Sequence, residues 1–510
     1  MAPPRSSARK PQKKGLLKEI ASKYFTVNFF KSLIFDPAKL EWVSYLILAA
    51  ELVLNIFIVL EIKYTEIDWV AYMQEVEGFL NGTTDYSQLR GDTGPLVYPA
   101  FFVYVYSIFY FVTSFGKNIV LAQYIFVGIY MLQLWLVLRL YIKSRKIPPY
   151  VVALSVFTSY RIHSIYSLRL FNDPVAMVFF YGALNLFIDR KWTIGSIMFS
   201  LGVGIKMNVL LFAPAVLLLF ITSIGYLKTI IQLVVCAGVQ LIIGAPFLLT
   251  YPISYIKGSF DLGRIFEHKW TVNYRFLSRA IFEDPVFHIS LLLLHLILLA
   301  LVAKPCWLFF KNYARLRTLQ VQFEPQLHAE NRDIKERNAK RKEKRVKNKP
   351  EEEEELTEEQ KKFMKLFETG LKSQLGKGQA PPPLEEAPQQ EQIVQIHFDQ
   401  CCQLALLPIF LANFIGLVCA RSLHYQFYVW YFHSLPYLSW FTDYHDSIKI
   451  LLLFVIEFCW NQYPSTIFSS IMLHACHVFL LTGVVKKLYR ETRLARDASA
   501  AAATPTQKDD

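Results

Sequence analysis

The chain has few charged residues for its length. Only 19% of its 510 residues are charged, whereas 54% are hydrophobic and 15% are aromatic. The hydrophobic residues come in blocks long enough to cross a membrane, and a soluble protein of this length would need more polar surface. The composition therefore excludes an ordinary soluble enzyme and predicts an all-α polytopic membrane protein.

Cysteine and metal-binding motifs are scarce as well. We place none of the seven cysteines in an oxidising compartment, so no disulfide framework is predicted. There is no Asp-x-Asp motif and no His/Cys spacing typical of a metal site, so we expect neither a metal ion nor another cofactor. The sequence also lacks a cleavable signal pattern and a solenoid-type repeat. The basic N-terminus is then expected to stay in the cytosol, with the first span as its signal-anchor.

Basic residues exceed acidic residues, which gives a net charge of +13. They lie at the ends of hydrophobic blocks and in one low-complexity segment, a distribution typical of the cytoplasmic lipid surface. That segment, 313–399, contains KERNAKRKEKRVKNK, then EEEEE, then APPPLEEAPQQEQ, and has few apolar residues to support a core. We interpret it as a cytosolic insert that can be partly helical. We expect no nucleic-acid partner, because such charge runs are usually solvated.

Charge also predicts how the chain crosses the membrane. Block 97–114 is rich in Tyr and Phe, and if it crossed the membrane, every later basic cluster would face the wrong side. We therefore expect it to lie along the luminal interface or to re-enter. The other blocks then alternate as about twelve spans of ~20 residues, with both termini cytosolic. These spans are 42–62, 119–142, 149–160, 175–188, 194–205, 209–223, 230–250, 289–303, 404–420, 428–441, 448–460 and 467–485.

These features divide the chain into five segments. They are a basic cytosolic tail (1–41), an N-terminal membrane module with luminal loops (42–312), the insert (313–399), a C-terminal membrane module (400–490) and a cytosolic tail (491–510). A transporter would carry charges midway along its spans and show repeat symmetry between its halves. We find few such charges, Glu457 being the clearest, and no repeat. A non-catalytic scaffold would depend on the insert.

The longest polar stretch in the first half of the chain is 64–99. It follows the first span directly, so it is predicted to be luminal. Acids held at a membrane surface lose solvation and usually have a function there. The stretch is therefore the predicted active-site loop, and it carries six acids: Glu66, Asp68, Glu75, Glu77, Asp85 and Asp92.

Basic and polar residues gather on the other predicted luminal segments. A carboxylate opposite Arg and Lys suits a phosphate-bearing substrate, because the bases bind phosphate and the carboxylate accepts a proton from an attacking group. Besides Asp92, the candidate substrate-binding residues are Arg161, His163, Arg169, Asn172, Asp173, Lys206, Arg264, Arg275, Arg421, His424, Tyr425 and Gln426.

Simpler interpretations exist for several of these residues. Asp68 precedes a helical pattern and would serve as its cap, and Asp92 in GDTGP would form a turn. The sequence Asn172-Asp173-Pro174 is typical of a helix start. Lys206 has the stronger functional case, because a lone Lys between two apolar spans is costly unless it binds an anion or reaches the surface.

Several long motifs carry a resemblance to a known family. They are YTEIDW, GDTGPLVYP, LRLFNDPVAM, KMNVLLFAP, WTVN and ARSLHYQFYVWYFHSLPYL. They resemble the dolichyl-phosphate-mannose-dependent α-1,3-mannosyltransferases of the endoplasmic reticulum, which are lipid-dependent glycosyltransferases with a C-type membrane fold. The resemblance covers nearly the whole chain apart from the N-terminal tail and the insert. It implies three partners: dolichyl-phosphate mannose, a lipid-linked five-mannose oligosaccharide acceptor and membrane lipid.

The same resemblance implies a mechanism. It places the catalytic acid of the first luminal loop at Asp68 and predicts juxtamembrane helices in that loop. The acceptor 3-hydroxyl would attack the anomeric carbon of the donor in a single inverting displacement, Asp68 would remove its proton, and basic side chains would stabilise the leaving phosphate without a metal. Asp92 is expected to assist, and the remaining acids of the loop are expected to face solvent. The endoplasmic reticulum membrane, with a luminal active site, is the implied location.

Overall fold

The computed structural model describes residues 26–260, 266–347 and 396–503, which are mostly helical. The chain forms two compact units. The first consists of Met1–Ala314 and Asp399–Asp510, and the second is Arg315–Phe398. Every candidate site residue within the described ranges belongs to the first unit. Arg264 lies outside these ranges.

The elements up to residue 260 come first. A single β-hairpin, β1 (Arg90–Gly91) with β2 (Gly94–Pro95), lies among helices. The helices are α2 (Val27–Phe35), η1 (Pro37–Lys39), α3 (Leu40–Glu61), α4 (Trp69–Leu80), α5 (Ala100–Val112), α6 (Ile119–Ser144), α7 (Pro149–Thr158), α8 (Tyr160–His163), η2 (Ser164–Leu168), α9 (Asp173–Ile188), α10 (Trp192–Ile205), η3 (Met207–Phe212), α11 (Ala213–Leu248) and α12 (Pro252–Ser259).

The remaining described residues are also helical, joined by short connections. They form η4 (His268–Trp270), α13 (Arg279–Phe282), α14 (Pro285–Lys347), η5 (Phe398–Cys402), α16 (Gln403–Val418), η6 (Tyr425–Trp430), η7 (Phe432–Ser434), α17 (Leu435–Phe441), α18 (Asp446–Asn461) and α19 (Ile467–Ala503).

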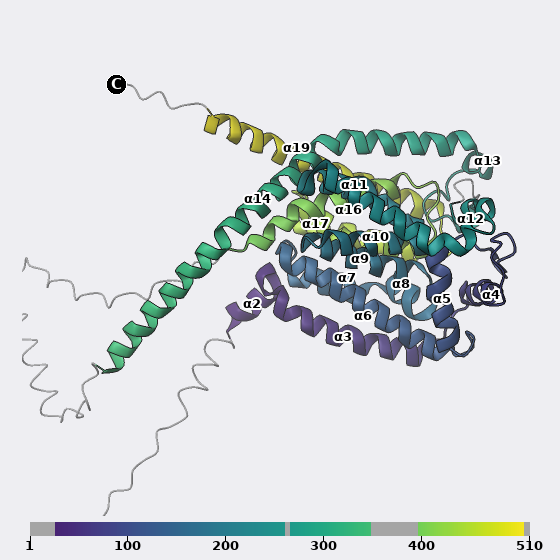
Figure 1. The fold of residues 1–510 in the computed structure, drawn as a ribbon, viewed down its shortest axis with the longest axis horizontal. Coiled ribbons are helices and arrows are strands. Elements are labelled where there is room, and N and C mark those ends of the chain that lie inside the picture. The colour runs from purple at the N-terminus through teal and green to yellow at the C-terminus, as the bar shows by residue number, and fades with distance from the viewer. Residues whose placement is uncertain (1–25, 261–265, 348–395, 504–510) are drawn as a thin grey trace, which may run out of the picture. The chain divides into compact units, whose positions relative to one another are not determined.

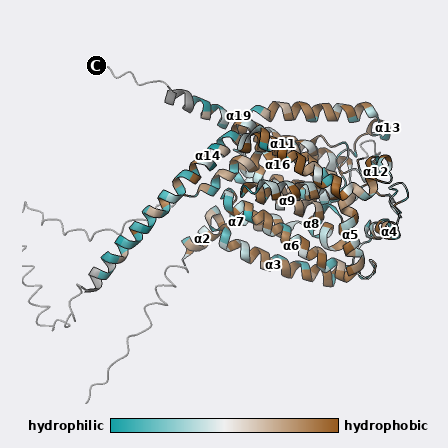
Figure 2. Ribbon diagram, viewed as in Figure 1, coloured by the Kyte–Doolittle hydropathy of each residue, from teal (hydrophilic) through white to brown (hydrophobic). Residues whose placement is uncertain are grey.

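Several of these helices suit a membrane. By length and composition, the described residues contain six candidate spans, and a seventh if the bent pair Tyr160–Leu168 and Asp173–Ile188 counts as one. Figure 2 shows that helices such as α3 and α6 are largely hydrophobic along their length. The chain is therefore a helical, multi-pass membrane protein. The six spans are Pro37–Glu61, Ile119–Ser144, Met207–Leu248, Pro285–Arg341, Phe398–Val418 and Ile467–Asp497.

The first span contains an acid that the sequence analysis overlooked. The predicted span 42–62 corresponds to α3, which begins at Leu40 and ends at Glu61. Glu51 lies midway along it and is 0% exposed, as is Asn55 one turn later. Glu457 is therefore not the only acid buried within a predicted span. Glu51 was overlooked because one acid barely lowers the mean hydropathy of a long apolar block.

The tyrosine- and phenylalanine-rich block 97–114 forms α5. This helix has 13 residues, so it is about 20 Å long, whereas the apolar core of a bilayer is about 30 Å thick. Figure 1 draws α5 beside α4 at the end of the bundle where α3 ends, and the two helices pack against each other. Trp69 of α4 joins this interface through rings of α5, including Tyr106 at 6.2 Å between centroids.

The predicted loop 161–174 is mostly helix, which corrects the sequence analysis. Its residues form α8, then the π-helical η2, then the start of α9. The backbone must be hydrogen-bonded here because the segment is buried. The predicted helix start at Asn172-Asp173-Pro174 is confirmed: α9 begins at Asp173, with Pro174 in its first turn.

The predicted span 428–441 is not one continuous helix, which is a second correction. It is divided among η6, η7 and α17. Broken backbone is tolerated at membrane depth only when the protein itself surrounds it and satisfies its polar groups. The segment is buried throughout, and Asn413 donates from Nδ2 to the carbonyl of Trp430 at 3.0 Å.

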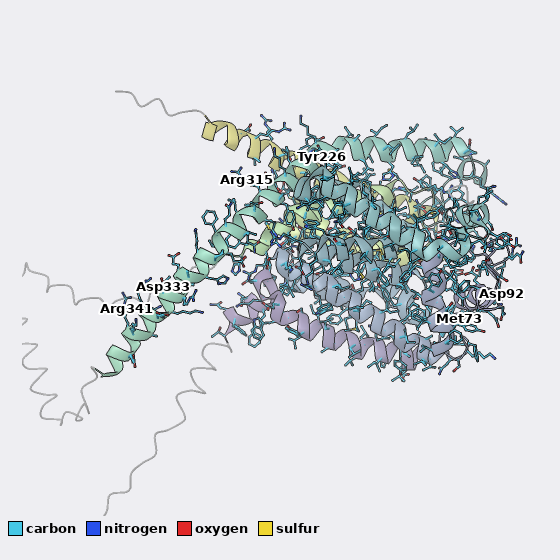
Figure 3. The ribbon with its side chains drawn as sticks, in the orientation of Figure 1. Met73, Asp92, Tyr226, Arg315, Asp333 and Arg341 are labelled. Carbon is cyan, nitrogen blue, oxygen red and sulfur yellow. The ribbon has the colours of Figure 1, made fainter. Side chains whose placement is uncertain are left out.

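The predicted spans 209–223 and 230–250 meet at a glycine. The first begins in η3 and both continue through α11, but Gly225 has φ +78° and ψ 169°, which no right-handed helix contains. Glycine adopts this backbone without a Cβ clash, so the kink falls where the sequence allows it. Figure 3 labels Tyr226, the residue that follows the break.

Two helices continue past their predicted ends. Helix α14 runs from Pro285 to Lys347, so it passes the predicted start of the insert at residue 313. Its portion in the second unit carries charged side chains, including the labelled Arg315, Asp333 and Arg341 (Figure 3). Helix α19 likewise extends from Ile467 to Ala503, beyond the predicted span 467–485.

Candidate active site

Asp68 is the N-cap residue of α4, but it does not cap the helix with its side chain. Glu66 does so instead: its Oε1 accepts a hydrogen bond from the N–H of Val70 at 3.0 Å. Asp68 is half-buried, and the hydroxyl of Tyr72 donates to its Oδ2 at a long 3.3 Å. The simple capping interpretation of Asp68 therefore has little support, because another acid performs that task.

The loop that carries Asp68 is fixed from two sides. The N–H of Thr65 donates to the carbonyl of Leu168 in η2 at 3.0 Å, which ties the loop to the other half of the site. On the far side, the hairpin packs directly onto α4. A Cβ added at Gly91 would lie 2.5 Å from the carbonyl oxygen of Ala71, so only glycine permits this approach.

Two tyrosines lead from Asp68 to the interior. The rings of Tyr72 and Tyr98 pack edge-to-face with centroids 5.8 Å apart. Desolvation, followed by the nearby charges of Asp68 and Glu75, raises the pKa of Tyr98 well above its ordinary value. A phenol is protonated at physiological pH even at its ordinary pKa of 10.0, so Tyr98 can donate a hydrogen bond.

Lys206 lies on the other side of Tyr98. It follows α10 in extended backbone and is 8% exposed. Its Nζ donates to Oδ2 of Asp173 at 2.7 Å and to Oδ1 of Asn172 at 2.9 Å. A buried ammonium is costly unless it is paired, so this ion pair keeps Lys206 charged within the apolar bundle.

Aromatic rings enclose the Lys206 ammonium. Its Nζ lies 5.3 Å from the ring centre of Tyr98, 5.4 Å from Phe427 and 6.0 Å from Trp430. Cations are attracted to ring faces at these distances. The indole N–H of Trp430 also donates to Oδ1 of Asp173, so η6 supplies both a wall of the site and a hydrogen bond to it.

His424 lies one ring further out. Its imidazole stacks on Phe427 with centroids 5.4 Å apart and meets Phe266 edge-on at 5.0 Å. Since the Phe427 ring centre also lies 5.4 Å from Nζ of Lys206, contacts connect the predicted residues Asn172, Asp173, Lys206 and His424, and we call this group the Lys206 centre. Asp68 reaches it only through Tyr98, which lies near both Asp68 and Lys206.

Arg169 precedes Asn172 by three residues. It is half-buried, and its Nη1 is buried without a hydrogen-bond partner among the described residues. Arg161 is close enough to repel it electrostatically. An unsatisfied guanidinium nitrogen next to a like charge is a position that an anion would stabilise.

Arg161 and Tyr425 donate hydrogen bonds to backbone carbonyls at the C-terminal end of α18. Arg161 donates from Nε to the carbonyl of Trp460 at 2.9 Å and from Nη2 to that of Asn461 at 3.3 Å. Its guanidinium lies 4.6 Å from the ring centre of Tyr425, whose hydroxyl donates to the carbonyl of Gln462 at 2.8 Å. Basic side chains commonly satisfy the last carbonyls of a helix in this way.

The remaining candidates make contacts of their own. His163 is buried against Glu51 of α3. Arg275 donates from Nη1 to the carbonyl of His268 at 3.1 Å, which holds its own loop. Arg421 lies over the ring of Phe266 at 5.2 Å, and Gln426 is half-buried on η6.

Asp92 occupies the exposed turn between β1 and β2. Its backbone N–H donates to Oε1 of Gln74 at 2.7 Å, which anchors the hairpin to α4. Figure 3 shows Asp92 at the outer edge of the end of the bundle that contains α4. These contacts agree with the turn-forming interpretation.

A model of the ALG3 protein family matches residues 45–470. The chain belongs to the ALG3 family.

Members of the family from distant organisms are similar over nearly their whole length. A Drosophila melanogaster protein named dolichyl-P-Man:Man5GlcNAc2-PP-dolichol alpha-1,3-mannosyltransferase l(2)not2 is 59% identical over 483 residues, which cover 94% of this chain and 99% of that protein. The mouse Dol-P-Man:Man(5)GlcNAc(2)-PP-Dol alpha-1,3-mannosyltransferase is 40% identical, covering 88% of this chain and 87% of its own. The Arabidopsis thaliana protein of the same name is 37% identical, with 86% and 87% covered.

Several residues around the centre of this ALG3-family chain were not singled out from the sequence. Tyr98 and Trp430 looked like ordinary interfacial aromatics, because nothing in their spacing distinguishes them from a membrane belt. Glu75 was expected to face solvent but is 3% exposed, which is a correction. It lies seven residues after Asp68, hence on the same face of α4, a periodicity that would have predicted its burial.

Metal ligands do not cluster in the described part of the chain. Among those residues there is no group of three or more His, Cys, Asp and Glu side chains that could hold a metal ion.

Proposed function

We propose that this chain transfers mannose from dolichyl-phosphate mannose in α-1,3 linkage to the lipid-linked five-mannose oligosaccharide, with Asp68 as the general base. Membership of the ALG3 family supports the reaction, since the relatives are named for that donor, acceptor and linkage. One structural observation carries the choice of base. Asp68 is half-buried, its side chain does not cap α4, and its charge lies near Tyr98, whose ring centre is 5.3 Å from Nζ of Lys206.

The proton moves to Asp68 in this proposal. The acceptor 3-hydroxyl oxygen forms a bond to the anomeric carbon of the donor mannose as the bond from that carbon to the phosphate oxygen breaks. The electron pair of the broken bond leaves with dolichyl phosphate, and the hydroxyl proton passes to the Asp68 carboxylate. A positioned base of this kind typically contributes 10²–10⁴-fold to the rate. Direct attack inverts the configuration at the anomeric carbon.

Basic side chains stabilise the leaving phosphate. Lys206 is the central cation, held in place by Asp173 and Asn172. Arg169 supplies a guanidinium whose Nη1 is unsatisfied within the described residues. Fixed donors that face developing negative charge in a dry site are worth more than in water, because they need no reorganisation. We propose that these cations act in place of a metal ion.

We further propose the membrane arrangement that this reaction needs. The chain has a C-type glycosyltransferase fold with about twelve spans, its termini and insert are cytosolic, and its site faces the lumen of the endoplasmic reticulum. Glycosylation sites introduced in turn test this arrangement. A site at the exposed Asp92–Thr93 turn should be modified, whereas sites in the N-terminal tail or in the insert should not. The opposite pattern would invert the topology.

An assay of the purified chain tests the function directly. It contains dolichyl-phosphate mannose and lipid-linked five-mannose acceptor, followed by linkage analysis of the product. One added mannose in α-1,3 linkage is the expected result. The Asp68→Asn variant is the matched control, because it changes one oxygen for nitrogen and keeps the shape of the side chain. A different linkage, or transfer that does not depend on Asp68, contradicts the proposal.

A further inference from the structure

A chain of buried polar side chains crosses from the first span to the π-helical segment η2. Oε2 of Glu51 lies 2.8 Å from Nε2 of His163, and both residues are almost completely buried. One turn along α3, Asn55 donates from Nδ2 to the Glu51 backbone carbonyl at 2.9 Å and accepts from the hydroxyl of Ser167 at 3.0 Å. Two consecutive turns of α3 are therefore bonded to α8 and η2.

A single hydrogen bond joins Glu51 and His163. His163 Nδ1 lies 2.7 Å from the carbonyl oxygen of Ser159, which can only accept, so Nδ1 carries a hydrogen. A hydrogen bond between Nε2 and Glu51 then needs one further proton, placed on either the imidazole or the carboxyl group. In both cases the two side chains form one directed contact with a fixed ring orientation.

Segment η2 connects this contact to both halves of the proposed active site. The carbonyl of its last residue, Leu168, accepts the N–H of Thr65, three residues before Asp68. Directly after Leu168 the chain continues into Arg169 and, three residues later, Asn172, whose Oδ1 accepts from Nζ of Lys206. A displacement of η2 would therefore move the base loop and the phosphate-binding residues together.

A π-helical turn needs such support. Its extra residue widens the helix, and single π-turns inside α-helices occur frequently at functional sites. Here the carbonyl of Ser167 also accepts Nε2 of Gln123 from α6 at 2.8 Å, so two spans hold the turn by side-chain hydrogen bonds. Apolar residues of similar volume would pack in this interior without the desolvation penalty that Glu51 and His163 carry. Stability alone thus does not account for the pair.

We propose that Glu51 and His163 are positioning residues, which hold η2 so that Asp68 and the Lys206 centre face each other at the correct distance. The proposal rests on the proposed function for its rate predictions. Both side chains are buried in the bundle, so the proposal assigns His163 a positioning role in place of the predicted substrate contact.

Kinetics of the full-length chain test the proposal. Glu51→Ala should lower kcat by about tenfold to a hundredfold and leave KM for the donor within about threefold, because misplacement by about 1 Å slows chemistry more than it weakens binding. Glu51→Gln should retain a kcat within about threefold, since an amide N–H can donate to Nε2 of a neutral imidazole. A parental kcat in Glu51→Ala, or no rescue by Glu51→Gln, overturns the proposal.

A paired apolar variant separates positioning from stability. Glu51→Leu with His163→Leu removes both polar partners, so its unfolding temperature should approach that of the parent chain. Its kcat should remain low, because Leu cannot orient η2. Recovery of the parental kcat together with stability would reduce the pair to a structural contact.

Asn185→Ala is the matched control. Asn185 is a buried amide of α9 that donates to the carbonyls of Leu136 and Tyr181, so its loss should lower stability and leave kcat at the parental value.

An activity-independent measurement separates this proposal from the proposed function. Amide hydrogen exchange of the peptide that contains Thr65 should accelerate in Glu51→Ala and not in Asn185→Ala. Unchanged exchange refutes the positioning role whether or not the parent chain transfers mannose. An inactive parent chain with accelerated exchange in Glu51→Ala refutes the proposed function alone.

Discussion

Two aspartates begin two helices of the proposed site, and they are used in opposite ways. Asp173 opens α9 and is 0% exposed; one of its oxygens accepts from Lys206 and the other from Trp430. Asp68 opens α4 and is half-buried, with a 3.3 Å hydrogen bond from Tyr72. One carboxylate is committed to a buried cation, whereas the other keeps a surface that a substrate can reach. The same residue type thus becomes scaffold or base according to its partners.

Asp68→Asn should have the largest effect on activity. The amide cannot accept the hydroxyl proton, so kcat should fall by about 10³-fold, within the range for a general base. The unfolding temperature should stay within about 2 °C, because Glu66 and not Asp68 caps α4. Glu77→Gln, at an exposed acid of the same loop, is the control and should keep kcat within about threefold. Substantial activity in Asp68→Asn would remove the contrast between the two aspartates.

Asp173→Asn should instead damage the fold as well as the reaction. It leaves the buried Lys206 ammonium without its charged partner, an imbalance that typically costs about 3–5 kcal/mol of stability. Thermal unfolding of the detergent-solubilised protein measures this loss. Adding Lys206→Met should restore most of the stability without restoring transfer. If the single variant were as stable as the parent chain, Asp173 would not be the scaffold residue.

Tyr98→Phe tests the bridge between the two aspartates. The ring packing with Tyr72 and Lys206 would remain, and only the protonated hydroxyl would be lost. We expect kcat to fall about tenfold, which corresponds to one hydrogen bond of about 1.4 kcal/mol. Steady-state kinetics at saturating donor measure it. An effect as large as that of Asp68→Asn would indicate that Tyr98 takes part in proton transfer.

The smallest expected effect concerns Asp85, a third acid of the same loop. The hydroxyl of Ser254 on α12 donates to Asp85 at 2.5 Å, and this bond, with those from Ser87, lowers the pKa of Asp85 below its ordinary value of 3.8. A lowered folded-state pKa stabilises the fold above pH 3.8 and loses that effect as pH falls through the folded-state value. Asp85→Asn should therefore have a slightly lower unfolding temperature than the parent chain at pH 7. The difference between the two unfolding temperatures should shrink as the pH is lowered. A difference in unfolding temperature that stays constant with pH would contradict the stabilising role of the ionised Asp85.

Helix boundaries were predictable from the sequence where a local signal marks them. The first span agrees with α3 to within two residues, and the start of α9 follows from Asn172-Asp173-Pro174. Both depend on local signals, namely the length of an apolar block and the restricted φ of proline. The broken segment 425–441 was not predictable, because its support comes from distant partners such as Asn413 and Asp173.

The site was predictable in part for the same reason. Asp68 and Lys206 stood out as charges next to apolar spans, and the structure gathers residues from both sides of Tyr98. The role of Glu51 was not predictable, because the mean hydropathy of a whole span hardly changes with one acid. The role also depends on a hydrogen bond with His163, over a hundred positions later in the sequence. Residue type suggests which groups can act; only the fold decides which of them are already bonded.

The contact between Gly91 and Ala71 limits how this region can vary. No side chain fits at position 91, where a Cβ would meet the backbone of α4, and Gly94, its partner in the hairpin, has φ +135°, which favours glycine. Asp92 and Thr93 between them are exposed, so their side chains are less constrained. Substitutions of the Asp92 and Thr93 side chains should therefore leave α4 in place. Sequence variation in this loop is then expected at its exposed turn, where it does not change the orientation of Asp68.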